Sequence, residues 1–399
     1  MGPRPRLARL VLVRPDGVLL GTLPDLEIST PWWQDIKPVV DAVFEAHGQV
    51  ITVLRILSVD QQTDRVVVTY LAEATGTFPA IPCAIALAHD SRRAAYAEIG
   101  GPARDLAWAR ERLAALEIEG PIAATQVRTW NLSSLWCLTA GDQTWWLKAV
   151  PGFMAHEGAV IAALSAHPVP RLLAHDKGRV LLANIDGDDL YEAMEDQRRA
   201  MIAALVNIQI AWANEQVSHP TSVPGWRAEH LTPMIAGTLD RYGARLSLAD
   251  RDILSQFVED LPRRLADLSA CGLPETLIHG DFHSGNVRGE GLNLTLLDWG
   301  DSGIGHPLLD QSAFLTGLDK PVAARLGKYW SELWRAAIPG SDPDRAAILI
   351  APVSAARRAV VYQDFLDQIE PSEHPYHADD PTEWLGRTAQ ILRDQGFGN

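Results

Sequence analysis

The feature that most constrains this chain is the stretch 277–287, Leu-Ile-His-Gly-Asp-Phe-His-Ser-Gly-Asn-Val, followed by Leu-Leu-Asp-Trp-Gly at 296–300. Each stretch starts with a short apolar run that favours a buried strand. The first run delivers Asp281 and then Asn286, and the second delivers Asp298. The fold has to place two carboxylates and one amide at the ends of neighbouring apolar segments.

Phosphoryl transfer from a nucleotide uses this set of groups. One carboxylate orients and deprotonates the attacking hydroxyl, while an amide oxygen and a second carboxylate hold the metal ions bound to the phosphates. The sequence therefore favours Asp281 as the group that contacts the hydroxyl. It favours Asn286 and Asp298 as the metal ligands.

Composition limits the possible partners. The chain has 399 residues, which predicts two or three domains, and its formal net charge is −15. Nucleic acid and anionic membranes attract basic surfaces, so neither is an expected partner. The negative charge suits a small, cationic substrate, and it equally suits solubility alone. Oligomeric state is left open by the sequence.

The sequence predicts a cytoplasmic protein. The three cysteines are far apart and show neither a disulfide framework nor a zinc spacing. The basic start, residues 1–6, precedes an apolar run that is too short and too often interrupted by arginine for a signal peptide. No stretch has the roughly 18 uninterrupted apolar residues of a membrane span.

Residues 1–100 predict a small α+β accessory domain. Pattern and turn chemistry indicate a hairpin, a helix closed by Gly48, two further strands, and a helix. The predicted ranges are 7–13 and 18–20 for the hairpin, about 36–46 for the first helix, 51–57 and 66–71 for the strands, and 92–99 for the last helix.

This layout loosely resembles a Nudix domain, but the chemistry of that family is missing. Nudix proteins bind metal with a cluster of glutamates on the helix before the closing glycine. With that glycine aligned on Gly48, only Glu45 of the cluster remains. We therefore expect a non-catalytic domain that serves packing, dimerisation or substrate covering.

Residues 101–190 predict a β-rich lobe, and residues 191–399 a helical one. The lobe comprises a helix over 103–116, strands over 125–129, 135–138 and 144–150, and a further strand over 180–185. Lys148 stands alone among apolar strand residues, which is costly unless the lysine is paired, and Glu157 at the start of the next helix is the nearby partner. The predicted later helices cover 191–212, 232–242, 248–270, 321–337 and 345–368.

The stretch 279–286 resembles the catalytic loop of the aminoglycoside phosphotransferase and choline kinase family. The stretch 297–310 resembles its metal-binding segment, and the resemblance extends from about Asp105 to the C-terminus. It implies an α+β fold of the bilobal protein-kinase-like type, preceded by the accessory domain. It also implies an ATP-dependent, Mg²⁺-dependent transfer to a hydroxyl of an aminoglycoside, an amino sugar or another sugar.

The resemblance also implies roles for individual residues. Asp281 would be the catalytic base, Asn286 and Asp298 would hold Mg²⁺, and Lys148, held by Glu157, would contact the α and β phosphates. Ser133 and Ser134 would cover the phosphates with hydroxyl and N–H groups where protein kinases use glycines. The backbone of Ala183 and Ile185 would bind adenine.

Several polar residues have more than one interpretation. His279 and His283 are spaced like a helical metal pair, but the glycines beside them disfavour a helix, so His279 is expected to anchor the loop and His283 to lie near substrate or phosphate. Asp310 is expected to be structural, and Asp301 is either a surface group or close to the metals. Asp364, Asp367, Glu370 and Glu373 are candidates for binding substrate ammonium groups, or else form a solvated face.

Alternative functions follow from the same residues. The family also includes kinases for amino alcohols such as choline and homoserine, and the fold does not choose among acceptors. A nucleotide-binding pseudokinase or regulatory module is a second class of function, which the intact set of Lys148, Asp281, Asn286 and Asp298 disfavours. A Nudix-type hydrolase in the first hundred residues is a third.

Overall fold

A computed structural model of the chain describes residues 6–118, 120–216, 220 and 223–397. The chain divides into two units, each built from segments that are separate in the sequence. The first unit comprises Met1–Gly158, Leu172–Asn184 and Leu366–Tyr376, and the second comprises Ala159–Arg171, Ile185–Phe365 and His377–Asn399. The prediction made for the basic start of the chain falls largely on residues 1–5, which lie outside the described residues.

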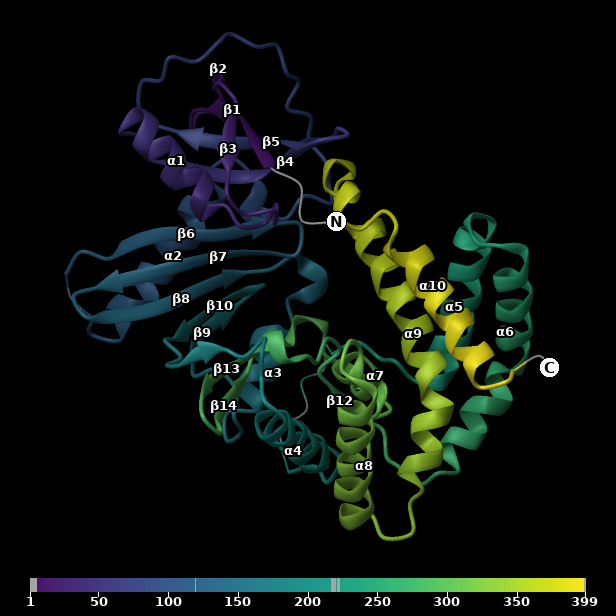
Figure 1. The fold of residues 1–399 in the computed structure, drawn as a ribbon. Helices are drawn as coiled ribbons and strands as arrows, with labels where there is room; N and C mark the ends of the chain where they lie inside the picture. Colours follow the sequence, from purple (N-terminus) through teal and green to yellow (C-terminus); the bar gives the residue numbers. More distant parts are fainter. Residues whose placement is uncertain (1–5, 119, 217–219, 221–222, 398–399) are drawn as a thin grey trace. The chain divides into compact units, whose positions relative to one another are not determined.

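The first unit opens with a mixed β-sheet in the order β2-β1-β5-β4, with β3 paired to β1 (Figure 1). The strands are β1 (Arg6–Val13), β2 (Leu19–Thr22), β3 (Leu26–Ile28), β4 (Ile51–Gln61) and β5 (Val66–Ala74). β1 is antiparallel to β2, which confirms the predicted hairpin, and parallel to β5. Helix α1 (Lys37–His47) contributes to the core on one face, and Gly48 ends it with φ of 64°, as predicted.

A second sheet in the same unit is antiparallel, in the order β6-β7-β8-β10-β9. Its strands are β6 (Ala123–Trp130), β7 (Ser133–Ala140), β8 (Gln143–Ala149), β9 (Leu172–Asp176) and β10 (Arg179–Ala183). Helix α2 (Gly101–Ala115) packs its Trp108 and Leu113 into a core with Trp136, Leu138 and Leu147. The short η2 (Gly152–Met154) and α3 (Glu157–Ala163) follow β8.

Gln126 joins the two sheets of the first unit. This side chain on β6 is 3% exposed. Its Oε1 accepts a hydrogen bond from the Val53 backbone N–H at 2.9 Å, and its Nε2 donates to the Val53 carbonyl at 2.7 Å. The amide thus pairs with β4 as a neighbouring strand would, and no buried polar group of this pair is left unsatisfied.

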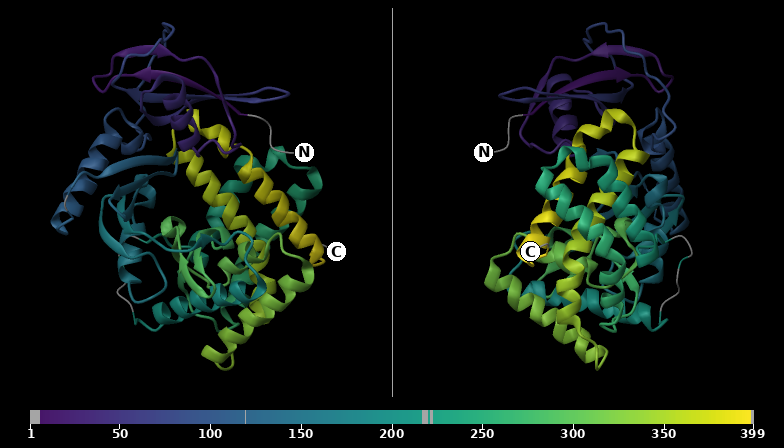
Figure 2. Two further views of the ribbon diagram at one scale, coloured as in Figure 1. Left: turned by 60° about the vertical axis from the view of Figure 1, so that its left-hand side comes forward. Right: turned by 90° about the vertical axis from the view of Figure 1, so that its right-hand side faces the viewer.

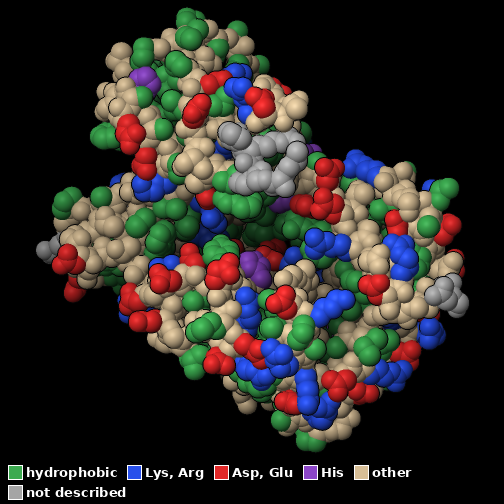
Figure 3. Space-filling view, in the orientation of Figure 1, with side chains coloured by type: hydrophobic (Ala, Val, Ile, Leu, Met, Phe, Trp, Pro, Cys, Tyr) green, Lys and Arg blue, Asp and Glu red, His purple; other side chains and the backbone are tan. Residues whose placement is uncertain are grey.

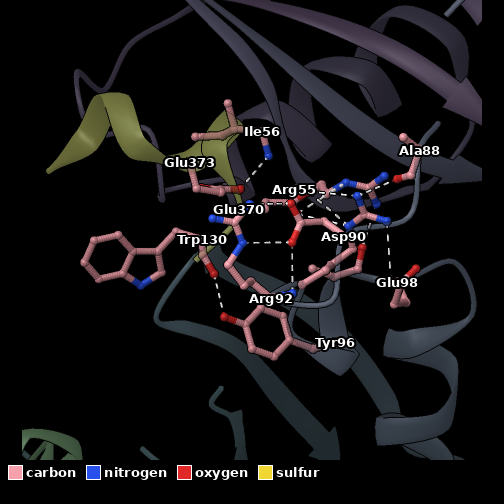
Figure 4. Close-up of polar contacts among 12 residues, drawn as sticks. Arg55, Ile56, Ala88, Asp90, Arg92, Tyr96, Glu98, Trp130, Glu370 and Glu373 are labelled. Carbon is pink, nitrogen blue, oxygen red and sulfur yellow. Dashed lines mark hydrogen bonds and ion pairs between the residues drawn. The ribbon is translucent and has the colours of Figure 1, made fainter. Parts of the chain in front are cut away.

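The segment Leu366–Tyr376 is held in the first unit by buried carboxylates (Figure 4). Glu370 forms ion pairs with Arg93 at 2.8 Å and with Arg55 at 3.6 Å, and all three side chains are at most 9% exposed. Glu373, in η6 (Pro371–Tyr376), accepts a hydrogen bond from the Ile56 backbone N–H at 2.8 Å. Two arginines and an amide of the N-terminal region therefore bind a segment that follows them by about 270 residues or more.

The predicted helix over 92–99 is wrong. The structure has only a 3₁₀ turn there, η1 (Ala95–Ala97). The Asp90 carboxylate accepts the Arg92 backbone N–H at 2.9 Å, a local bond that competes with helix formation. Arg93 then binds Glu370, and the buried Tyr96 donates its hydroxyl hydrogen to the Trp130 carbonyl at 2.7 Å, so tertiary contacts set this backbone.

The second unit is mainly helical. Its longer helices are α4 (Glu195–Ala213), α5 (Ala228–Tyr242), α6 (Leu248–Ser269), α8 (Lys320–Ala337), α9 (Pro343–Gln368) and α10 (Asp380–Asp394), with α7 (Leu309–Leu315) shorter; the last turn of α9 belongs to the first unit. α5, α6 and α10 lie side by side (Figure 2). These boundaries agree with the predicted helices, except that the one predicted from Tyr191 begins at Glu195 and the one predicted from about Thr232 begins at Ala228. Helices α7 and α10 were not among the predicted helices.

Short strands and 3₁₀ turns complete the second unit. β11 (Asp188–Asp189), β13 (Val287–Glu290) and β14 (Asn293–Leu296) form one small sheet, and β12 (Thr276–Ile278) pairs with β15 (Gly303–Gly305). The turns are η3 (Gly243–Arg245), η4 (Ser284–Asn286) and η5 (Trp299–Asp301). On the visible face of the helical unit, acidic and basic side chains are interspersed (Figure 3). Among the described helices, none combines the length and apolarity needed to cross a membrane.

A change at Glu373 tests the buried carboxylates through pH. Burial, with a smaller contribution from Glu370, raises the pKa of Glu373 to about 8 from an ordinary value of 4.5. Between these values the folded protein keeps a proton that the unfolded chain releases, so the wild type loses stability as pH rises through this window. Glu373→Gln cannot ionise and should gain on the order of 2 kcal/mol over wild type between pH 5 and pH 8.5, measured by thermal unfolding.

The matched control is Glu27→Gln, an exposed glutamate on β3. Its unfolding temperature should follow that of the wild type across the same pH range. Parallel curves for wild type and Glu373→Gln would show that Glu373 ionises alike in the folded and unfolded protein.

Candidate active site

The loop that carries Asp281 leaves β12 through Gly280, which has φ of +88°. A Cβ atom at Gly280 would lie 1.9 Å from the Asp301 carbonyl oxygen, so the close approach of two backbone segments excludes a side chain here. Because β12 pairs with β15, which lies just beyond Asp301, the strand pairing creates this approach. The conformation of Gly280 then sets the direction in which Asp281 leaves the strand.

A buried carboxylate fixes this backbone. Asp310, on α7 and 1% exposed, accepts the N–H of His279 at 2.9 Å and that of Gly280 at 2.8 Å. Gln209 of α4 donates to the same carboxylate at 3.1 Å. Asp310 therefore has the structural role predicted from the sequence. His279 Nε2 lies 2.7 Å from the Leu297 carbonyl, which can only accept, so His279 donates and anchors the loop as expected.

Aromatic packing around Phe282 supports the loop. Phe282 is fully buried, and its ring stacks on Phe314 with centroids 4.7 Å apart and meets Trp330 edge-on. Since Phe282 directly follows Asp281, burying its ring turns the Asp281 side chain the other way. The Asp281 side chain is 34% exposed.

Asp281 has different neighbours at its two carboxylate oxygens. Asn286 Nδ2 lies 3.3 Å from Oδ2 and donates at 2.9 Å to the Asp281 backbone carbonyl. His283 Nε2 lies 3.4 Å from Oδ2, while Oδ1 forms an ion pair with Nη2 of Arg358 on α9. Burial works to raise the pKa of Asp281, but the hydrogen bond from His283 and the charge of Arg358 outweigh it and hold the pKa below its usual range. The carboxylate is ionised at neutral pH.

Asp298 follows β14 in a strained conformation, with φ of 61° and ψ of 67°. Such values are uncommon outside glycine and concentrate at functional sites. The backbone N–H of the preceding Leu297 donates to the Asn286 carbonyl at 2.8 Å, which ties the two candidate metal ligands together. Burial raises the pKa of the neighbouring Asp301 to about 7, and the charges of Asp281 and Asp298 add to the rise. Asp301 therefore lies near these carboxylates.

The donor set fits Mg²⁺ bound together with phosphates. Asn286 and Asp298 offer an amide and carboxylate oxygens, and Mg²⁺ is usually held by one or two carboxylates with substrate phosphates completing its shell. Among the described residues, no group of three or more His, Cys, Asp and Glu side chains has the geometry of a complete metal cage. The oxygen donors near Asp301 gather negative charge that a divalent cation would offset.

In the first unit, Lys148 and Glu157 meet as the sequence predicts. Nζ of Lys148 lies 2.8 Å from Oε1 of Glu157, with the side chains 14% and 3% exposed. Lys148 lies on β8, and Glu157 opens α3. Gly158 allows α3 to approach β9, because a Cβ there would lie 2.6 Å from the His175 side chain. The ion pair holds the ammonium group of Lys148 in place.

The hydroxyl groups of Ser133 and Ser134 both accept hydrogen bonds from tryptophan side chains. Ser133 accepts a hydrogen bond from the Trp130 indole N–H at 3.1 Å, and Ser134 accepts one from Trp136 at 3.2 Å. Ser134 is 1% exposed, so its hydroxyl supports Trp136 and is not available to a phosphate. Both serines begin β7, and the connection to β6 is a tight turn at Asn131 and Leu132.

The two predicted adenine-binding positions are placed differently. Ala183 ends β10 and pairs with Trp145 of β8 in the first unit. Ile185 belongs to the second unit, where its carbonyl accepts a hydrogen bond from Arg288 at 2.9 Å. This hydrogen bond occupies the Ile185 carbonyl but not its N–H group, and adenine binding at Ala183 and Ile185 stays a prediction.

The predicted substrate carboxylates are not gathered at Asp281. Glu370 binds Arg55 and Arg93 in the first unit, so its predicted contact with substrate is corrected to a structural role. Asp364 and Asp367 lie six and nine residues after Arg358 on α9, which is about 240° and 180° around the helix and so on other faces. His283 does lie beside Asp281, at 3.4 Å.

The sequence prediction missed Arg357 and Arg358. Arg357 is 2% exposed, donates to the Gly280 carbonyl at 3.4 Å, and lies 4.2 Å above the Trp226 ring, while Arg358 binds Asp281. Burial lowers the pKa of Arg357 to about 10, so it still carries a charge at neutral pH. The sequence did contain a signal for them. Two arginines stand within the otherwise apolar run 355–361, and a charged residue among apolar ones needs a partner, as for Lys148.

Comparison with known proteins decides the class. A family model described as the phosphotransferase enzyme family matches residues 125–349, which is more than half of the chain. The chain belongs to this family. The match confirms the predicted small-molecule kinase class at the level of the family, and it covers the Lys148 strand, the Asp281 loop and Asp298 of this phosphotransferase. No curated protein sequence matches the chain significantly.

Similarity to a solved choline kinase confirms the kinase-like fold. A choline kinase from Cryptosporidium parvum aligns with a TM-score of 0.51 at 11% identity, covering 74% of this chain and 97% of that chain. A choline/ethanolamine kinase family protein from Mesorhizobium loti gives 0.47 at 17%, covering 72% and 94%. A thermostable mutant of the aminoglycoside phosphotransferase APH(4)-Ia gives 0.47 at 16%, covering 71% and 99%. At these identities the likeness concerns the fold.

Gly280→Ala tests whether backbone approach positions Asp281. The alanine methyl group would meet the Asp301 carbonyl, in addition to the cost of about 1–2 kcal/mol for an alanine with positive φ. We expect a large loss of thermal stability and of phosphoryl transfer. Gly291→Ala is the matched control, because Gly291 has φ of +60° and a methyl group added there would have no atom within 4 Å, so it carries the conformational cost alone. Equal effects of the two changes would contradict the proposed role of the contact.

Proposed function

We propose that this phosphotransferase transfers the γ-phosphoryl group of ATP to a hydroxyl group of a small, sugar-sized acceptor. The observation that carries the proposal is the convergence, on one anchored loop system, of an ionised Asp281, the Asn286 amide and the strained Asp298. A hydroxyl nucleophile needs a carboxylate in position, and the phosphates need metal ligands nearby. These are the groups that the second unit supplies.

Asp281 orients the acceptor hydroxyl and accepts its proton. Its lowered pKa makes it a weak base, which suits a loose transition state in which the hydroxyl loses its proton late. Alignment of the hydroxyl with the phosphorus then matters more than basicity. The hydrogen bonds of Gly280, His279 and Asp310 give Asp281 that alignment.

Asn286 and Asp298 are the residues proposed to hold Mg²⁺. When bound, the metal ion would neutralise charge on the β and γ phosphates during transfer. In the first unit, Lys148 would contact the α and β phosphates, with Glu157 keeping its ammonium group in place. The backbone of β7 after Leu132 and the ends of the 183–185 segment remain the candidates for phosphate and adenine contacts.

The acceptor is proposed on chemistry and not on the names of similar proteins. Aminoglycosides, amino sugars, other sugars and amino alcohols all present a hydroxyl group that Asp281 could orient. A solved complex of APH(4)-Ia contains AMP-PNP and hygromycin B, which shows what that protein binds. A cytoplasmic location stays a prediction from the sequence.

A panel of acceptors with ATP and Mg²⁺ tests the function, with ADP release as the readout. Asp281→Asn should reduce turnover by about 10³-fold or more, because it removes the group that aligns and deprotonates the hydroxyl, while ATP affinity changes little. Near-normal turnover in the variant would reject the role of Asp281. Tight ATP binding with no turnover of any hydroxyl compound would favour a regulatory module instead.

Asp298→Ala should raise the Mg²⁺ concentration needed for half-maximal rate as well as lowering the rate, because a metal ligand is lost. Titration of Mg²⁺ at saturating ATP measures this. The matched comparison is Asp301→Asn. Asp301 lies on the same turn but is not assigned as a ligand, so the Mg²⁺ requirement of this variant should change less than that of Asp298→Ala. An unchanged Mg²⁺ requirement in Asp298→Ala would reject Asp298 as a ligand.

A further inference from the structure

The Asp281 carboxylate has a metal side and an opposite side. Its Oδ2 atom faces Asn286 and His283, and Asn286 is a proposed metal ligand. Its Oδ1 atom faces Arg358 of α9. An acceptor hydroxyl must reach the carboxylate without displacing the metal-bound phosphates, so the acceptor body lies toward α9.

The α9 side is lined by cations and aromatic rings. Tyr362 lies one turn after Arg358, on the same helix face. The guanidinium of Arg358 lies 4.9 Å from the ring centroid of Trp384 on α10, and that of Arg387 lies 4.6 Å from the same ring. A ring that contacts two guanidinium groups attracts both by cation–π interaction, so positive charge is fixed along this wall.

Arg358 stays protonated, and its bond to Asp281 does not use all of its N–H donors. Burial tends to lower its pKa, but the charge of Asp281 outweighs this and the pKa is raised. Its bond to Asp281 uses Nη2, whereas a guanidinium has five N–H donors arranged to bind a carboxylate with two parallel bonds. The side chain is 17% exposed, so an acceptor can reach part of it.

Two carboxylates near this wall, Asp380 and Asp301, have other charged groups beside them. Asp380 lies 3.0 Å from Nδ1 of His377, and Asp301 lies among the carboxylates that surround the proposed metal site. Glu370 is bound by arginines in the first unit, and Asp364 and Asp367 lie on other faces of α9. An ammonium group placed beside Arg358 would meet a like charge, which is unfavourable.

We propose that Arg358 selects an acceptor that carries a carboxylate near its reactive hydroxyl group, a hydroxy acid or sugar acid, and disfavours cationic acceptors such as aminoglycosides. This inference rests on the proposed phosphoryl transfer at Asp281. The acceptor oxygen forms a bond to the γ-phosphorus as the bond to the β–γ bridging oxygen breaks, ADP leaves, and the hydroxyl proton passes to Asp281. The acceptor carboxylate is unchanged and serves only for binding.

Matched acceptors that differ in one group test the inference on the full-length protein. One series is glucuronate, glucose and glucosamine, and a second is glycerate, glycerol and serinol, with glucose 6-phosphate added to separate a carboxylate from a phosphate. The readout is kcat/KM from ADP release. We expect the carboxylate member to exceed the neutral member by about tenfold or more, the effect of about 1.4 kcal/mol of charge attraction, and the ammonium member to be the poorest.

Variants of Arg358 assign the selectivity. Arg358→Gln should raise KM for the carboxylate acceptor by about tenfold or more relative to the neutral one and so remove the preference, and Arg358→Lys should retain part of it because the charge remains. Arg335→Gln is the control, an exposed arginine paired with Asp344, and should leave the ranking unchanged. Thermal unfolding of each variant shows whether it is folded.

Two results would overturn the inference while leaving the proposed function intact. The first is a wild type that prefers the neutral, ammonium or phosphate member, with turnover that Asp281→Asn abolishes. The second is an Arg358→Gln variant that lowers kcat for all acceptors equally, which would show that Arg358 only positions Asp281. If Arg358→Gln does not fold, the wild-type ranking alone decides, and if no acceptor is phosphorylated, both proposals fail.

Discussion

The position of Asp281 depends on hydrogen bonds from two backbone N–H groups, those of His279 and Gly280, to the buried carboxylate of Asp310. Asp310 is reached only after the chain has formed β13, β14, η5 and β15, so the loop acquires its shape when the end of this segment packs back against its beginning. Gly280 allows the contact because a side chain there would meet Asp301. One buried anion thus replaces the regular ladder that a longer strand would provide.

Charge balance around this loop is the second constraint. Asp301 lies within electrostatic reach of both Asp281 and Asp298, and buried like charges are costly unless they are offset. The chain offsets part of this charge with Arg357 and Arg358 from α9, and the proposed Mg²⁺ would offset the remainder on the opposite side of Asp281. Arg358 both binds Asp281 and is the residue proposed to face the acceptor, so loop stability and substrate choice would be linked at this side chain.

The N-terminal region is built into the first unit and is not a loosely attached addition. Gln126 pairs with Val53, Tyr96 donates to the Trp130 carbonyl, and the segment Leu366–Tyr376 binds Arg55, Arg93 and Ile56. Tyr376 also meets the rings of Trp33 and Trp130 at 5.4 and 5.0 Å. The contacts of Trp130 with Tyr96 and Tyr376 lie beside the β6–β7 turn, where the phosphate-covering loop was predicted.

The motifs by themselves predicted the chemistry. Asp281, Asn286 and Asp298 could be named because catalysis of phosphoryl transfer needs those groups at fixed spacing, and Lys148 because a lone cation in an apolar strand requires a partner, which proved to be Glu157. Strand and helix periodicity predicted most element boundaries, because periodicity is a local property of the sequence.

Tertiary structure decided the roles that depend on long-range contacts. Glu370 could not be assigned from its neighbours in sequence, because its partner Arg93 is 277 residues away. Residues 92–99 do not form the predicted helix, because Arg93 and Tyr96 make long-range contacts instead. Arg358 became visible as a partner of Asp281 only once α9 was packed, because a charge in an apolar run reveals that it needs a partner but not which one.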